Sequence, residues 1–119
     1  MSTSVLDSTK KKLGLTADYQ YFDEDQLYDY INLAFSELHQ LGAGPAAGYY
    51  VDDPLDDWNG FTQDIPLQNL VKSYVYIRVR LLFDPPTTSF VLDSLNKQLD
   101  ELKWRINVYV DPNNTFSSE

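Results

Sequence analysis

Residues 70–89, LVKSYVYIRVRLLFDPPTTS, decide the fold of this chain. Their apolar side chains surround most of a helical wheel and are interrupted mainly by Arg78 and Arg80. A helix that is apolar on nearly every side belongs inside a bundle, with other segments packed around it. The double proline at 85–86 must end this helix, because proline donates no backbone hydrogen bond and disfavours helical geometry at the residue before it. The pattern predicts a central helix over 65–83.

Three further helices are predicted around this one. The first, over 3–13, is short and ends in three lysines, where the helix dipole favours cations. The second, over 23–41, starts with a capping-box pattern and repeats apolar residues three and four apart. The last, over 89–110, has a seam of apolar residues typical of a coiled coil. The predicted fold is all-α, a small bundle of about four helices (approximately 3–13, 23–41, 65–83 and 89–110).

The residues before these helices are suitable N-caps, whose side chains accept hydrogen bonds from the first helical N–H groups. The expected caps are Thr3 or Ser4, Asp23, Asp64, and Thr88 or Ser89. At 119 residues the chain is expected to be one domain, with a single helical unit over 1–110 and a polar tail over 111–119.

Residues 42–64, GAGPAAGYYVDDPLDDWNGFTQD, form a long loop between the second and third predicted helices. The loop is acidic and contains no lysine or arginine. Compact domains rarely contain so long a loop unless it is functional or disordered, and its aromatic residues argue against disorder because they offer area to bury. We expect the loop to pack partly on its own bundle and partly on a neighbouring protein, with a self-contained surface loop as the alternative. The aromatic residues expected at such a contact are Tyr49, Tyr50, Trp58 and Phe61.

The other expected contact residues lie on the last two helices and in the tail. Arg78 and Arg80 interrupt an apolar helix, so they are expected to pair with carboxylates of their own chain or of a neighbouring subunit. Trp104 lies off the apolar seam, beside Arg105, and is either the flank of a broad core or an anchor at an interface. Phe116 is a possible docking residue in a tail that otherwise resembles a frayed end.

Several classes of function do not fit the sequence. The aspartates of the loop come as adjacent pairs, 52–53 and 56–57, which does not match the alternating acids of an EF-hand. The lone histidine, His39, has no serine or cysteine motif beside it, so a helix-surface role is expected. We therefore predict no catalytic residue, no cofactor site and no metal site, and a protein that is not an enzyme.

Charge and composition narrow the class further. A formal net charge of −9 disfavours a sequence-reading nucleic-acid binder, which would need a basic face. The absence of cysteine excludes disulfides and favours synthesis in a reducing compartment. No apolar segment is long enough to serve as a signal peptide or to cross a membrane, so no membrane partner is expected.

Two segments carry a resemblance to a known family. Residues 71–107, VKSYVYIRVRLLFDPPTTSFVLDSLNKQLDELKWRIN, resemble the C-terminal half of head–tail connector (adaptor, or head completion) proteins of long-tailed, siphovirus-type bacteriophages. Upstream, FDEDQLYDYINLAFSELHQLG at 22–42 and WNGFTQDIP at 58–66 are similar to the same family. The resemblance covers about residues 7–108, and its motifs are structural rather than catalytic.

The resemblance implies a homo-oligomeric ring, commonly of twelve copies, that binds beneath the portal protein in the virion. Such a ring joins capsid to tail, extends the channel for double-stranded DNA, and supports the next connector, stopper or tail-terminator protein. Its subunits would be made in the host cytoplasm and reside at the head–tail junction. In that family the extended loop and the tail, here 42–64 and 111–119, tend to contact other subunits and the portal.

Two other kinds of function remain open. An acidic helical module that blocks a basic partner, as a DNA-mimicking inhibitor or regulatory adaptor would, fits the charge. A small enzyme is the weakest alternative, because its acids lie in a loop and on solvated helix faces without a nucleophile–base pair.

Overall fold

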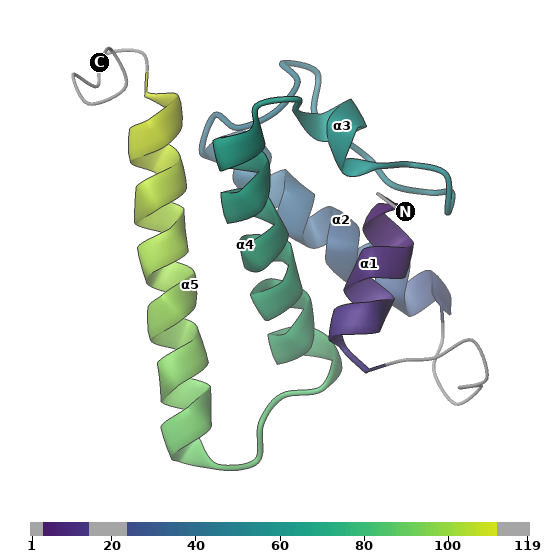
Figure 1. Ribbon diagram of the computed structural model, residues 1–119. Coiled ribbons are helices and arrows are strands. Elements are labelled where there is room, and N and C mark those ends of the chain that lie inside the picture. Colours follow the sequence, from purple (N-terminus) through teal and green to yellow (C-terminus); the bar gives the residue numbers. More distant parts are fainter. Residues whose placement is uncertain (1–3, 15–23, 112–119) are drawn as a thin grey trace.

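The computed structural model describes residues 4–14 and 24–111, and these residues form an all-α bundle without strands (Figure 1). Four helices follow the predicted ranges closely, and one short helix was not predicted. The helices are α1 (Val5–Lys12), α2 (Glu24–Gln40), α3 (Trp58–Phe61), α4 (Ile65–Phe83) and α5 (Ser89–Val110).

Helix α4 is the centre of the bundle, as predicted from its apolar sequence. Each of the extensive helix–helix contacts among the described residues involves α4, with α5 and α2 as its largest partners. Figure 1 shows α4 between α5 on one side and α1 and α2 on the other. Four of its side chains are fully buried: Val71, Tyr74, Val75 and Val79. The buried face of α2 (Leu27, Ile31, Ala34, Phe35 and Leu38) completes most of the core.

The helix ends follow the predicted local chemistry. The Ser4 side chain accepts a hydrogen bond from the Asp7 N–H at 3.2 Å, and Asp64 accepts one from the Leu67 N–H at 3.4 Å. Both predicted N-caps are therefore confirmed. Thr88 occupies the N-cap position of α5 but makes no side-chain capping bond. The predicted cap at position 23 lies outside the described residues.

The elbow after α4 aligns α5 along one side of α4 alone. Asp84 ends α4 with a non-helical φ of −148° and ψ of 69°, and α5 starts after the prolines, as the sequence predicts. Of the α5 seam, only Leu99 and Ile106 are buried. Helix α5 is thus an outer helix with one face on the bundle and the rest open to solvent (Figure 1).

The long loop is not structureless, because α3 interrupts it and its ends are fastened to other elements. The Val5 N–H donates to the Asp56 carbonyl at 3.0 Å, beside an isolated bridge between residues 4 and 57. The Asn32 amide on α2 holds Val51 from both sides, accepting from its N–H at 2.7 Å and donating to its carbonyl at 2.8 Å. These bonds place the loop against its own bundle, and its expected contact with a neighbouring protein stays a prediction.

Candidate assembly interface

Three of the four loop aromatics form a cluster on α2. The Phe35 ring lies 5.2 Å from Tyr49, 5.9 Å from Trp58 and 5.1 Å from Phe61, measured between ring centroids. Tyr49 packs edge-on against both phenylalanines and donates its hydroxyl to the Asp57 carbonyl at 2.6 Å. Such tilted and edge-to-face arrangements are favourable beyond the area they bury.

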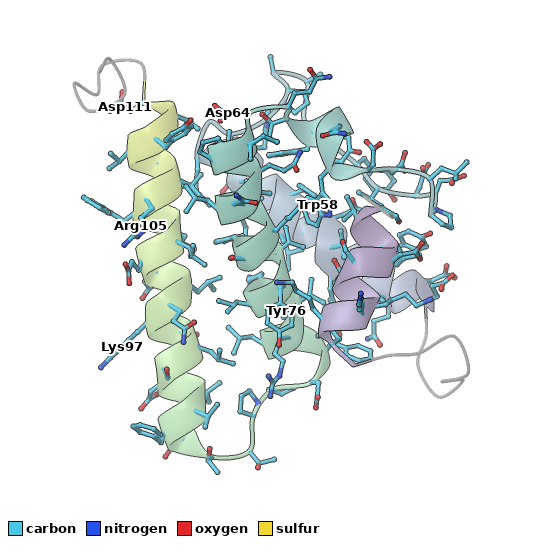
Figure 2. The ribbon with its side chains drawn as sticks, viewed as in Figure 1. Trp58, Asp64, Tyr76, Lys97, Arg105 and Asp111 are labelled. Atoms are coloured by element: carbon cyan, nitrogen blue, oxygen red, sulfur yellow. The ribbon has the colours of Figure 1, made fainter. Side chains whose placement is uncertain are left out.

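Trp58 and Phe61 are core residues of the folded chain, with exposed fractions of 2% and 4%. The Trp58 indole N–H donates to the Ser8 hydroxyl on α1 at 2.9 Å, which joins two segments far apart in sequence (Figure 2). Phe61 fills the space beside Gly44, where an added Cβ would overlap its ring. These two rings therefore offer almost no surface to a second subunit, contrary to their predicted role at such a contact. Tyr50 differs, with 67% of its surface exposed.

Arg78 pairs with a carboxylate of its own chain, which is the first of the two predicted alternatives. Its Nε donates to the two carboxylate oxygens of Glu37 on α2 at 3.0 and 3.1 Å, and the Tyr74 hydroxyl donates to the same carboxylate at 2.6 Å. Burial and the hydrogen bond to Glu37 together raise the pKa of Tyr74. Arg80 instead donates to the main-chain carbonyl of Asp84 at 3.2 Å, so it supports the end of α4 rather than a distant carboxylate.

The α5 candidates lie on the open side of that helix. Trp104 is 64% exposed, so the alternative that made it a flank of the core is wrong for this fold. Arg105 pairs with Glu101 one turn before it, with Nη2 2.8 Å from the carboxylate, and both side chains are more than half exposed. Figure 2 shows Lys97 projecting from the outer side of α5. The candidate at position 116 lies outside the described residues.

The two most exposed large apolar residues of the described chain were not predicted from the sequence. Phe90, in the first turn of α5, is 82% exposed, and Leu55, at the loop tip, is 87% exposed. Phe90 stands two heptads before Trp104, so the two rings lie on the same side of α5. That spacing was present in the sequence but was hidden by the stronger apolar seam. Large apolar side chains left in solvent are candidates for contact with another protein.

A family model described as phage connector protein matches residues 5–113, which is most of the chain. The chain belongs to the phage connector protein family. No curated protein and no solved structure matches it significantly. The family is one of structural phage proteins, in agreement with the resemblance found in the sequence.

A groove of about 400 Å³ lies between α4 and α5 of this connector. Its floor is apolar, and Lys12 of α1 and Arg105 of α5 stand at its rim. The groove-lining residues are Lys12, Leu70, Ser73, Tyr76, Ile77, Leu95, Gln98, Glu101, Leu102 and Arg105. Lys12 and Tyr76 also line a smaller hollow of about 150 Å³ that reaches Lys72, so the two concavities are neighbours.

Charge is divided unequally along the connector. All nine lysines and arginines lie at 10–12 and 72–105, on α1, α4 and α5. The segment 24–64, which contains α2, the loop and α3, has no lysine or arginine. Its acidic residues are Glu24, Asp25, Asp29, Glu37, Asp52, Asp53, Asp56, Asp57 and Asp64. The molecule therefore has an acidic part and a part that holds all of its lysines and arginines.

Within residues 4–14 and 24–111, no three histidine or acidic side chains are grouped closely enough to hold a metal ion. His39 is exposed at the rim of a hollow between α2 and the loop. No described helix is long and apolar enough to cross a membrane.

Proposed function

We propose that this chain is a structural, non-catalytic component of the virion of a long-tailed phage, assembled as a ring below the portal. The ring, of about twelve copies by analogy with the resembling family, joins capsid to tail and extends the channel through which double-stranded DNA passes. The match of residues 5–113 to the connector family carries this proposal. The portal protein and the next connector, stopper or tail-terminator protein are its proposed partners.

The open side of α5 supports this proposal. Phe90 and Trp104 leave large apolar areas in solvent on a helix whose main packing partner is α4. Aromatic residues in such positions are typical anchors of protein interfaces. A net charge of −9 also suits a conduit, because acidic walls repel phosphate and do not trap DNA.

The direct test mixes the purified chain with the portal protein of the same phage. Native mass spectrometry should find a complex with many copies of the chain on each portal, and electron microscopy should show a ring with an axial opening. Absence of any such complex, with both proteins folded, would contradict the proposal.

Alanine variants separate assembly from folding. Trp104→Ala should leave the free energy of unfolding within about 0.5 kcal/mol of the wild type, because the side chain is 64% exposed, and should weaken ring formation. Trp58→Ala should instead cost about 3–5 kcal/mol of stability, since that ring is buried. A Trp104→Ala variant that assembles like the wild type would remove this residue from the interface.

The acidic segment 24–64 favours a second candidate function, an inhibitor or adaptor that covers a basic partner. Salt separates the two candidates. Binding through charge alone should collapse between low and moderate ionic strength, whereas a ring anchored by aromatic contacts should persist.

A further inference from the structure

We propose that the loop tip Asp52–Asp57 of one copy docks into the α4–α5 groove of the next copy. This inference rests on the proposed ring and names the two surfaces that meet in it. The occupant of the groove is a second copy of this chain, selected by charge and by shape. The contact is head to tail, because the two surfaces are different.

The groove has the chemistry of a receptor for an acidic, apolar segment. Its apolar floor is formed in part by Leu70, Ile77 and Leu102. Lys12 stands at its rim with Nζ 5.7 Å from the centre of the Tyr76 ring, which the groove also exposes. Arg105 also lines the groove, where it pairs with the single lining carboxylate of Glu101, and Lys72 lies in the neighbouring hollow that shares Lys12 and Tyr76 with the groove. A net positive hollow is unexpected on a chain of charge −9 and calls for an acidic occupant.

The loop tip has the complementary chemistry. Leu55 is 87% exposed, and the four aspartates of the loop tip surround it in sequence. The tip is held in shape before any partner arrives, because Asp53 accepts a hydrogen bond from the Leu55 N–H at 2.7 Å. Asp56 accepts two more, from the N–H groups of residues 52 and 53 at 3.0 and 3.1 Å. A preorganised apolar tip with an acidic border loses little entropy when it enters a basic-rimmed groove.

The positions of the two surfaces favour contact between copies. Figure 1 shows the loop tip at the right-hand edge and α5 at the left-hand edge, with α1 and α4 between them. A surface that binds a different surface on an identical neighbour forms a heterologous contact, which produces a closed ring or an open filament. Dimerisation through like surfaces would instead bring two acidic parts together at an electrostatic cost.

The experiment compares two variants with matched controls. Leu55→Ser removes the apolar tip, and Lys12→Glu reverses a charge at the groove rim. Each should weaken ring assembly on the portal about tenfold or more, measured as the concentration for half-maximal loading. Ile65→Ser, at a 59% exposed apolar residue outside the loop tip, and Lys11→Glu, beside the groove but not lining it, should assemble like the wild type. Circular dichroism melts of all four should match the wild type.

Mixing the two variants tests the head-to-tail geometry without the portal. The Lys12→Glu copy keeps its loop and the Leu55→Ser copy keeps its groove, so one contact remains possible between unlike copies. Native mass spectrometry of the mixture, at concentrations where the wild type self-associates, should show heterodimers and no larger species. Wild-type self-association that neither variant changes would overturn the inference.

The outcomes also separate this inference from the proposed function. Rings that form equally well with both variants would leave the connector role intact and overturn the docking pair. Variants that no longer bind the portal as single copies, but still associate with one another, would assign the groove to the portal. That result would also overturn the docking pair. A wild-type chain that forms no ring and no self-associated species would contradict both.

Discussion

Replacement of Arg78 by methionine tests how α2 and α4 are held together. The Arg78 guanidinium donates to both oxygens of Glu37, and its removal leaves that carboxylate with Tyr74 as its remaining side-chain donor. Hydrogen bonds to charged groups contribute about 1.5–3 kcal/mol each. Because the two side chains are 24% and 26% exposed, solvent screening reduces the expected loss in the free energy of unfolding to about 1–2 kcal/mol. Methionine retains much of the packing of the arginine stem.

The loss in the free energy of unfolding caused by Arg78→Met should depend on pH in a defined direction. Partial burial raises the pKa of Glu37, but the hydrogen bonds from Arg78 and Tyr74 lower it by more, so its folded pKa lies below the ordinary 4.5. A carboxyl with a depressed folded pKa contributes stability that is fully present above its unfolded pKa and is lost as the pH falls through the folded value. The difference between wild type and Arg78→Met should therefore be largest near neutral pH and shrink in acid.

Urea denaturation followed by circular dichroism measures these differences. A double-mutant cycle of Arg78→Met with Glu37→Gln should give a coupling energy of about 1 kcal/mol at about pH 7 and less at about pH 4. Arg80→Met is the matched control on the same helix, since Arg80 donates only to a main-chain carbonyl and its loss should cost less. A coupling near zero at neutral pH, or one that does not decline in acid, would refute the reasoning.

Two further substitutions test the loop and its junction with α4. Gly44→Ala should destabilise the chain by about 2–3 kcal/mol, because φ is +87° and the new Cβ would meet the Phe61 ring. Gly14→Ala is the control: its φ is +81° but the space beside it is open, so it should cost only about 1–2 kcal/mol in urea titrations. Asp64→Ala removes the α4 cap and the acceptor of the Tyr109 hydroxyl, so thermal melts should show a loss of about 1–2 kcal/mol; no loss would show that the cap is not needed.

The helices themselves were predictable because their signals are local. The predicted ranges 65–83 and 89–110 coincide with α4 and α5, since a proline pair and an aspartate cap specify where each starts or ends. The predicted 3–13 and 23–41 differ from α1 and α2 by one or two residues. Periodicity and capping depend on neighbours within about four positions, so one chain contains enough information to place them.

The candidate contact residues were harder to assign because their exposure depends on distant segments. Trp58 is buried only because Ser8 and Phe35, from two other helices, close over it. Trp104 is exposed because α5 packs mainly on α4 through its opposite face, which no pattern within the helix reveals. Helix α3 has four residues, too few for an apolar period to be visible. Partners 41 positions apart, such as Arg78 and Glu37, also leave no local signal.

The acidic segment 24–64 folds without any lysine or arginine of its own because backbone donors satisfy many of its carboxylates. Asp57 caps α3, Asp64 caps α4, and Asp56 holds the loop tip, each through backbone N–H groups. Hydrogen bonds from N–H groups to a carboxylate are strong without a cationic partner. Glu24 and Glu37 form ion pairs with Lys10 and Arg78. Lys12 in the groove and Lys72 in the neighbouring hollow form no ion pair with this segment among the described residues. Because backbone N–H groups satisfy the aspartates of the acidic part, these lysines stay available to an acidic partner.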